Sequence, residues 1–403
     1  MTPLVRVVVV TRDGGRLLER CLECLARVDW PAPRLEVVLV DNASTDGSVE
    51  RAVAARPRTR VIRADHNLGY AAGNNLALDD LGNIDYVALL NNDAFVEGDW
   101  LRPLVDALES ERDLGAATSK VLFAPRYLDH RLAGPVTLRG VRVEGEDRWR
   151  DTLLPKGWLD VDSDPKDGPP VRRSKAEAKL WIPASPDRRA ELLVDDVWID
   201  VILAGDPFDV VNNVGSVLLP RGHAADRGFL QRDTGQFDEP EEVFAWSGTS
   251  VLLRRAYLEE VGLFDPRLFA YYEDLDLAWR GRARGWRYLY VPGSVVRHAH
   301  AATSIVGSAF FDYHVERNRL LVSVKNAPAA YALGAIGESL RVTGLHVRRD
   351  VVRRVVHGER PTTTFLRRRG RAFGGFLRGL PSALRVRDDV LPSTEVERWL
   401  DQR

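Results

Sequence analysis

The chain has 403 residues, so we expect one large core with additions rather than a single domain of the most common size. Hydrophobic residues make up 45% and charged residues 29%, which is typical of a soluble globular protein. The formal net charge of −1 excludes a global attraction to nucleic acid. No run approaches the ~20 apolar residues that a membrane span needs.

The chain contains two cysteines, Cys21 and Cys24, at C-x-x-C spacing. This spacing permits a zinc or redox interpretation, but no second pair follows, and Leu18 and Leu22 continue the apolar face of a predicted helix. We therefore interpret both as core cysteines. A reducing, cytoplasmic compartment fits this interpretation.

The first 125 residues alternate between strand and helix patterns. Continuous apolar runs predict strands, and apolar residues at helical spacing between them predict helices. This alternation indicates a mostly parallel sheet that is flanked by helices on both faces, an α/β fold. The predicted strands are residues 5–10, 35–40, 58–63, 86–90 and 115–123, and the predicted helices are 14–28, 48–55, 70–78 and 100–110.

The pattern changes near Tyr127. Short alternating runs such as 179–183 and 191–201 predict a β-rich insertion, after which α/β patterning resumes. The last segment is predicted to be helical and is strongly basic from 341 to 387. We place the segment boundaries at 1–125, 126–207, 208–325 and 326–403, with strands at 249–253 and 286–291 and helices at 273–284 and 310–325 in the third segment.

Polar residues follow the carboxyl ends of the predicted strands, where ligands bind in open parallel sheets. Each turn by itself is explained equally well by a helix cap, but four such turns at one edge predict a ligand crevice. An acidic side chain after the second strand can accept hydrogen bonds from a nucleobase or a ribose, so Asp41 is a candidate nucleoside-binding residue. The other candidates are Thr11, Arg12, Asp13, Asn67, Gly69, Asn74, Asn91 and Asn92.

The sequence lacks the glycine-rich motifs that bind phosphate through backbone amides. A bound diphosphate would therefore need another counter-charge, and a divalent cation held by carboxylate is the usual one. Asp93, after the strand 86–90, is the candidate ligand, with capping of the next helix as the alternative. Histidines follow the strand 286–291 in the run V-R-H-A-H, and a neutral imidazole suits Mn²⁺.

Adjacent carboxylates stand at the start of the predicted helix 273–284, in the run Y-Y-E-D-L-D. Transfer of a sugar to a hydroxyl group with inversion needs a base for that hydroxyl and a charge partner for the leaving diphosphate. Asp274 is a candidate for the base. The alternative is N-capping of the helix, a role that we expect of Asp276.

Taken in order, these motifs resemble the family 2 glycosyltransferases of the GT-A fold. The resemblance is to the branch of bacterial rhamnosyl- and galactofuranosyltransferases of cell-wall and O-antigen polysaccharide assembly. Each motif is weak by itself, but their ordered combination is highly specific. The matching segments are 7–11, 41–48 (D-N-A-S-T-D-G-S), 67–75 (N-L-G-Y-A-A-G-N-N), 89–93 (L-L-N-N-D), 248–265, 271–280 and 296–304.

The resemblance implies an inverting, metal-dependent enzyme that moves a sugar from a nucleoside diphosphate sugar to a saccharide acceptor. It assigns donor binding to 1–125 and the acceptor and catalytic half to 208–325. The cofactor would be Mn²⁺ or Mg²⁺. By this resemblance, Asp41 contacts the nucleobase, and Asn91 and Asp93 occupy the metal-binding D-x-D position. Asp274 is the catalytic base, with Glu273 beside it, and His298 is a metal ligand, with His300 as second choice. Trp246 and Gly248 lie on the acceptor side.

Two features depart from the family pattern. The D-x-D position reads N-N-D, which places metal binding mainly on Asp93 and His298 together with donor phosphates. The segment 126–207 is longer than the branch carries. We expect this segment to be an accessory element that shapes the acceptor side or forms a homo-oligomer contact. The alternative is a surface insertion that takes no part in catalysis.

The basic C-terminal segment has two interpretations. Arginines interspersed with Phe365, Phe373, Phe376 and Leu377 favour a surface for anionic lipid at the inner face of the cell membrane, which suits a polyprenyl-linked acceptor. A solvated helical face is the alternative. We expect no nucleic acid partner, because no recognised binding motif accompanies the charge.

Two further functions compete with glycosyl transfer. A nucleotide-sugar pyrophosphorylase-like enzyme is disfavoured by the missing phosphate-binding loop. A non-catalytic carbohydrate- or lipid-binding relative is disfavoured by the retained Asp93, Asp274 and His298.

Overall fold

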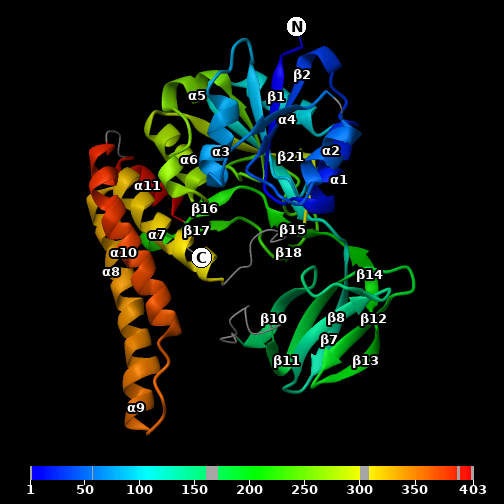
Figure 1. The fold of residues 1–403 in the computed structure, drawn as a ribbon, viewed down its shortest axis with the longest axis vertical. Coiled ribbons are helices and arrows are strands. Elements are labelled where there is room, and N and C mark those ends of the chain that lie inside the picture. Colours follow the sequence, from blue (N-terminus) through cyan, green and yellow to red (C-terminus); the bar gives the residue numbers. More distant parts are fainter. Residues whose placement is uncertain (1, 57, 160–170, 300–307, 388–390, 401–403) are drawn as a thin grey trace.

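The computed structural model describes residues 2–56, 58–159, 171–299, 308–387 and 391–400. Within these residues a central sheet of 11 strands forms the middle of the molecule, with helices on both faces (Figure 1). Its first part is parallel and runs in the order β4-β1-β2-β3. These strands are β1 (Val5–Thr11), β2 (Leu35–Asp41), β3 (Arg60–Arg63) and β4 (Tyr86–Leu90).

The second part of the sheet mixes strand directions. β20 (Ser250–Arg254) lies antiparallel between β4 and β6 (Leu114–Phe123), and β21 (Arg287–His298) runs parallel to β6. The expected α/β sheet is thus confirmed, but the strand predicted at 286–291 continues to His298 through a register shift. The remaining strands are β5 (Ala94–Val96), β15 (Val210–Asn213), β18 (Gln231–Arg232) and β19 (Glu241–Glu242).

Two hydrophobic clusters fill the space between this sheet and its helices. Side chains alternate between the faces of β1, so Val8 belongs to one cluster and Val7 and Val9 to the other. Cys21 is fully buried in the second cluster and Cys24 packs against it, which confirms them as core residues. The helices are α1 (Gly15–Leu25), α2 (Ser48–Ala55), α3 (Gly69–Leu78), α4 (Leu101–Ser110), α5 (Arg255–Val261) and α6 (Glu273–Ala283), with short 3-10 turns at η1 (Ala32–Arg34), η3 (Pro220–Gly222) and η4 (Pro266–Leu268).

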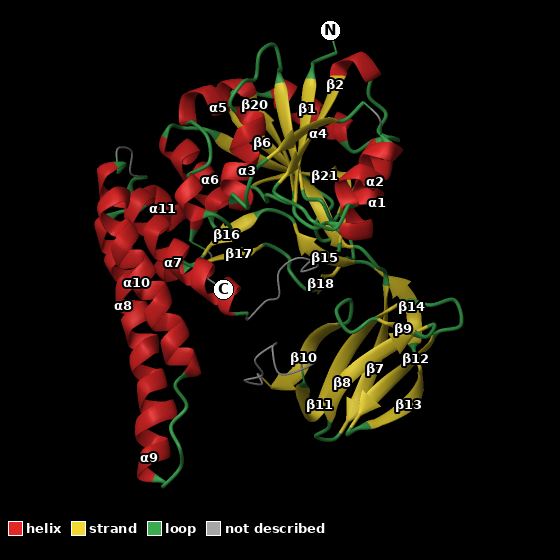
Figure 2. Cartoon of the chain, viewed as in Figure 1, coloured by secondary structure: helices red, strands yellow, loops and turns green. Residues whose placement is uncertain are grey.

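The insertion forms a separate sheet of eight described strands with its own apolar core, as Figure 2 shows. This confirms its predicted β-rich character. The run 191–201 is a hairpin, because Asp195 and Asp196 adopt φ values of 46° and 67° and reverse the chain. The strands are β7 (Tyr127–Ala133), β8 (Thr137–Val143), β9 (Glu146–Asp147), β10 (Leu153–Leu159), β11 (Arg172–Pro183), β12 (Arg189–Val194), β13 (Val197–Ile202) and β14 (Ala204–Phe208), and a small sheet follows with β16 (Ser216–Leu218) and β17 (Ala224–Asp226).

The C-terminal segment is helical, as predicted. α8 and α10 run side by side and project away from the central sheet, with α9 near the far end (Figure 1). None of the described helices has the length and apolar character to cross a membrane. The elements are α7 (Ala309–Asn326), α8 (Ala329–His346), a π-helical turn η5 (Val347–Arg353), α9 (Arg354–Val356), α10 (Thr364–Arg385) and α11 (Ser393–Trp399). The residue boundaries of the four segments remain predictions.

Candidate active site

A cleft of about 410 Å³ opens where β1 and β4 end, facing the start of α6 and the end of β21. Thr11 and Asp41 are paired in register, so β1 and β2 end at the same level of the sheet. Most of the residues predicted from sequence lie in the wall of this cleft. They are Thr11, Arg12, Asn67, Gly69, Asn91, Asn92, Asp93, Gly248, Glu273, Asp274 and His298.

Four predicted residues lie outside that wall. The buried Asp41 carboxylate accepts hydrogen bonds from Arg63 (2.7 Å) and from the Ser44 backbone N–H (2.9 Å). Asp13 accepts from the Thr45 backbone N–H at 2.7 Å, so both acids order the loop after β2. The other two are Asn74, which donates to the Tyr70 carbonyl at 2.9 Å, and Trp246, which is 0% exposed in the core behind the cleft.

Asp93 and His298 contact each other in the wall of the cleft. The distance from His298 Nε2 to Asp93 Oδ1 is 3.0 Å, and both side chains are buried. The other ring nitrogen, Nδ1, lies 3.1 Å from Asn212 Oδ1, which fixes the orientation of the ring. His300 lies outside the described residues.

This pair fits a divalent cation. Adjacent ligands of an octahedral ion at about 2.1 Å are roughly 3 Å apart, which matches the spacing of Asp93 Oδ1 and His298 Nε2. No cluster of three or more His, Cys, Asp or Glu side chains suitable for a metal occurs among the described residues. Among the described residues, a cation here would thus meet two such side chains, Asp93 and His298.

Glu273 and Asp274 open α6 on the other side of the cleft. Asp274 Oδ2 accepts a hydrogen bond from the Gly248 backbone N–H at 3.2 Å, and burial raises the pKa of Asp274. Burial and the neighbouring charge of Asp274 raise the pKa of Glu273 well above its ordinary value. Glu273 Oε2 is buried and has no hydrogen-bond partner among the described residues. Adjacent buried carboxyl groups of this kind titrate as a pair rather than independently.

Strained backbone leads into these two carboxylates. Phe269, Tyr271 and Tyr272 have φ values of 66°, 67° and 69°, which side chains other than glycine rarely adopt. Asn318 of α7 holds this loop: its Nδ2 donates to the carbonyls of Leu268, Ala270 and Tyr271 at 2.8 to 2.9 Å. The loop is thus fixed from behind by one buried side chain.

The start of α3 holds the same loop from the opposite side. The Phe269 carbonyl accepts from the backbone N–H groups of Tyr70 (2.7 Å) and Ala71 (3.1 Å). A Cβ on Gly69, whose φ is +78°, would lie 2.5 Å from that carbonyl oxygen. Gly69 is therefore required for close approach of two backbones, a reason separate from donor binding.

Asp276 has a structural role that differs from the expected one. The helix α6 has no side-chain N-cap, and Asp276 lies inside its first turn. Its fully buried carboxylate pairs with Lys325 (2.8 Å) and Asn326 (2.8 Å) of α7 and with Arg280 (3.1 Å) of α6. The prediction that Asp276 caps the helix is wrong, because tertiary partners on α7 compete for the carboxylate.

Several cleft residues were missed by sequence reasoning. Asn213 donates to Asp226, and desolvation together with the charge of Asp274 raises the pKa of Asp226 to about 6. The Tyr70 hydroxyl donates to the Gly248 carbonyl at 2.8 Å. Asn212 and Asn213 end the strand β15, and Asn91 and Asn92 follow the strand β4 in the same way. This repeated pair of asparagines at a strand end is the sequence pattern that indicates Asn212 and Asn213 as cleft residues.

The sequence matches two related family profiles. The family described as Glycosyl transferase family 2 matches residues 6–133, and Glycosyltransferase like family 2 matches residues 213–319. The N-acetylglucosaminyl-diphospho-decaprenol L-rhamnosyltransferase of Mycobacterium tuberculosis is 27% identical over 310 residues, which are 75% of this chain and 78% of that protein. The chain belongs to the family 2 glycosyltransferases.

Solved structures of glycosyltransferases are also similar to this chain. GalNAc-T7 with UDP, GalNAc and Mn²⁺ has a TM-score of 0.49 and 15% identity, over 81% of this chain and 48% of that chain. The mannosyltransferase PcManGT from Pyrobaculum calidifontis, with GDP-Man and Mn²⁺, has a TM-score of 0.42 and 16% identity, over 96% and 73%.

The two profile matches can be placed on the fold of this glycosyltransferase. The two profile matches lie on either side of the insertion, and the central sheet joins them into one core with the expected GT-A fold. Glycosyl transfer is the activity of the family, which decides against the pyrophosphorylase-like alternative.

Proposed function

We propose that this glycosyltransferase transfers a sugar, with inversion, from a nucleoside diphosphate sugar to a saccharide linked to a polyprenyl diphosphate. The observation that carries the proposal is one cleft whose wall contains both the Asp93–His298 pair and the Glu273–Asp274 pair. The printed name of the mycobacterial relative, a rhamnosyltransferase acting on a diphospho-decaprenol, supports this class of acceptor.

Asp274 is the catalytic base in this proposal. It takes the proton from the acceptor hydroxyl as that oxygen attacks the anomeric carbon, and the bond from that carbon to the donor diphosphate breaks. The raised pKa of Asp274 makes it a stronger base than an exposed carboxylate, while the Gly248 N–H fixes its position. Glu273 is the second carboxyl group of the pair, and its pKa is raised well above its ordinary value by burial and by the charge of Asp274.

Asp93 and His298 would hold Mn²⁺ or Mg²⁺ in this proposal. The cation supplies a positive charge that stabilises the leaving diphosphate. Asn212 orients the His298 ring and so determines which nitrogen is presented to the cleft. An imidazole ligand favours Mn²⁺ over Mg²⁺.

The remaining cleft residues on the sheet side would bind the donor. Thr11, Arg12 and Asn67 lie in the cleft wall, and Asp41 lies behind them at the end of β2. In this structure the Asp41 carboxylate is paired with Arg63, and this ion pair would have to rearrange before Asp41 could contact the nucleobase of the donor. Arg63 is therefore a second candidate for the contact with the nucleobase. Gly248 remains the proposed acceptor-side residue, with Ser247 in place of Trp246.

We also propose that the protein is cytoplasmic and binds the inner face of the cell membrane through α8, η5, α9 and α10. Valines and leucines on this hairpin are unusually exposed: Leu333 is 67%, Leu340 55% and Val356 76% exposed. Exposed arginines such as Arg348 and Arg353 lie among them. Such a surface combines apolar insertion with attraction to anionic lipid.

A homo-oligomer contact is proposed for the insertion. β13 is an edge strand of its sheet, and its Val197 and Ile202 are 60% and 74% exposed. An apolar edge strand is a template for pairing with another strand, here that of a second copy.

A thermal-shift screen of nucleoside diphosphate sugars with and without Mn²⁺ tests the proposed activity, followed by transfer assays with the stabilising donor. We expect stabilisation by one donor that depends on the metal, because a ligand that binds the folded state raises its melting temperature. Metal-dependent hydrolysis of that donor would exclude a non-catalytic relative. Absence of stabilisation, hydrolysis and transfer across all donors would overturn the proposal.

A further inference from the structure

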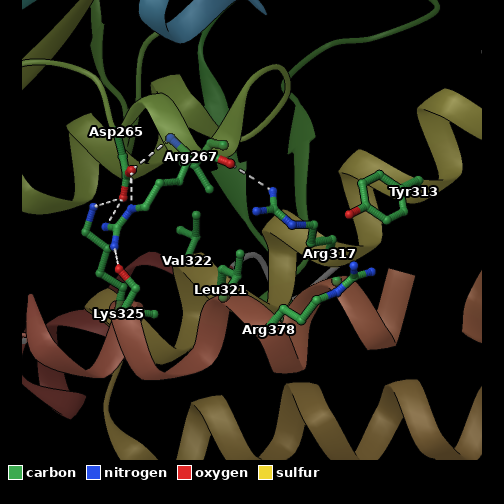
Figure 3. A pocket seen from close by; sticks show the side chains of 13 residues that line it. Asp265, Arg267, Tyr313, Arg317, Leu321, Val322, Lys325 and Arg378 are labelled. Atoms are coloured by element: carbon green, nitrogen blue, oxygen red, sulfur yellow. Dashed lines mark hydrogen bonds and ion pairs between the residues drawn. The ribbon is translucent and has the colours of Figure 1, made fainter. Parts of the chain in front are cut away.

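A second cavity, of about 350 Å³, lies between η4, α7 and α10 (Figure 3). Apolar side chains of α7, Leu321 and Val322, form its floor. Charged side chains stand at both ends, and the two ends differ in how their charges are paired.

At one end the charges are compensated within the protein. Asp265 accepts from Arg267 Nε at 2.7 Å and from Lys325 Nζ at 3.0 Å. These cations hold the pKa of Asp265 far below its usual range, against the opposing effect of burial. The contact between Lys325 and Asp265 joins the start of η4 to α7.

At the other end, positive charge is in excess. Arg317 is half-buried and donates to the Arg267 carbonyl (3.0 Å) and to Asn318 Oδ1 (2.7 Å), and the exposed Arg378 donates to the Gly374 carbonyl at 3.2 Å. Within the described part of the chain, neither guanidinium pairs with a carboxylate. Burial lowers the pKa of Arg317, because it disfavours the charged form of the guanidinium.

The carboxylates nearest along α7 do not compensate this charge. Asp312 pairs with Arg368 at 3.0 Å, and Glu316 pairs with Arg319 at 2.9 Å and Arg369 at 2.8 Å. Two guanidinium groups beside an apolar floor therefore remain to meet an anion supplied from outside.

Tyr313 adds a neutral donor at the same end. A Cβ on Gly375 would lie 2.5 Å from the Tyr313 hydroxyl and 3.1 Å from Arg317 Cδ, so both side chains pack directly on the backbone of α10. The Tyr313 hydroxyl makes no hydrogen bond to any residue that the structure describes. Tyr313, Arg317 and Arg378 thus provide donors where α7 and α10 meet (Figure 3).

This cavity adjoins the active-site cleft. Leu268 lines the cavity and the next residue, Phe269, lines the cleft. On α7, Phe311 lines the cleft and Tyr313 the cavity. The helix rises about 9 Å from Phe311 to Arg317, so a ligand that crosses the first two turns of α7 reaches both the cleft and the cavity.

We propose that Arg317, Arg378 and Tyr313 bind the diphosphate of a lipid-linked acceptor, with the first isoprenoid units over Leu321 and Val322. The proposal rests on the proposed function, because it places the acceptor sugar beside Asp274. It adds a recognition site for the lipid-linked diphosphate, outside the cleft that holds the donor.

Calorimetric titration of the full chain with farnesyl diphosphate, inorganic pyrophosphate and farnesol tests this site without any donor. We expect farnesyl diphosphate to bind more tightly than pyrophosphate and farnesol not to bind. Arg378→Gln should weaken farnesyl diphosphate binding at least about fivefold, since it removes a charge-assisted hydrogen bond. Arg371→Gln, at another exposed arginine of α10, is the matched control and should leave the affinity unchanged.

Arg317→Gln should weaken binding further, with a thermal melt to show that the variant is folded. Equal loss in the Arg371 control would overturn the site, and equal affinity for pyrophosphate and farnesyl diphosphate would overturn its lipid specificity. Loss of binding to phosphatidylglycerol vesicles alone would assign the arginines to membrane headgroups and overturn the proposal. Donor hydrolysis without farnesyl diphosphate binding would refute this site and leave the proposed function standing. Farnesyl diphosphate binding without donor hydrolysis or transfer would refute the proposed function and leave this site standing.

Discussion

At the scale of single residues, the proposed mechanism depends on the pH at which the Asp274 carboxyl group ionises. Its carboxylate must be unprotonated to accept a proton, and its pKa is raised by burial. Activity should therefore rise with pH through that raised pKa and fall as the pH drops below it. A profile of kcat against pH checks this sign, and a rate that falls as pH increases across the acid limb would contradict it.

Asp274→Asn removes the base while preserving the shape of the side chain. We expect kcat to fall by about 10²- to 10⁴-fold with donor affinity nearly unchanged, because the proposal assigns donor binding to other residues of the cleft. Steady-state kinetics and donor calorimetry measure the two effects. Near-normal turnover in this variant would assign the base elsewhere, with Asp226 as the next candidate in the cleft.

The proposed metal ligands can be tested separately from the proposed base. His298→Ala removes a nitrogen ligand and should weaken Mn²⁺-dependent donor binding by about tenfold or more. Asp93→Asn should have a similar effect. Donor calorimetry with and without Mn²⁺ provides the measurement. Unchanged metal-dependent affinity in both variants would refute the assignment.

At the scale of elements, α7 holds the strained loop that positions Glu273 and Asp274. Asn318→Leu keeps a similar volume but removes the donors to three carbonyls. We expect about 1–3 kcal/mol lower stability and at least about a tenfold lower kcat. The donor KM should stay near its normal value, since the sheet side of the cleft is untouched.

A matched variant separates this effect from general destabilisation. Leu192→Ala creates a cavity in the fully buried core of the insertion and should cost about 2–5 kcal/mol. Assayed well below its melting temperature, it should retain kcat. If both variants lose kcat in proportion to stability, Asn318 has no positioning role.

At the scale of the whole molecule, the helical hairpin is the surface proposed to bind the membrane. Val355 and Val356 are 56% and 76% exposed at its far end. Replacing both by serine should reduce binding to phosphatidylglycerol vesicles by about tenfold, because apolar burial is lost. Co-sedimentation measures binding, and Val197→Ser, at a valine of the insertion that is 60% exposed, serves as control. An equal loss in the control would argue against the hairpin.

The insertion edge is tested through the oligomeric state. Ile202→Lys places a charge on the exposed edge strand β13 and should shift a self-associated form toward monomer. Light scattering after size-exclusion chromatography provides the measurement. A monomer for the unaltered chain would remove the homo-oligomer proposal.

The sequence by itself determined the elements of the core and most of the cleft. Apolar runs such as 35–40 and 86–90 are long and bounded by polar turns, so local pattern alone predicts β2 and β4 and places their ends at one edge. The Asn91–Asp93 turn and the Glu273–Asp274 pair were found for this reason. Their roles remain predictions that the variants above test.

Only the tertiary structure decided which polar groups face the cleft. Asp274 and Asp276 are two residues apart on one helix, yet one meets the Gly248 N–H in the cleft and the other is neutralised by Lys325 of α7. Trp246 faces the core, and Asp226 enters the cleft from beyond the insertion. These outcomes depend on contacts between segments far apart in the chain, and burial and charge pairing there are set by partners that no local pattern encodes.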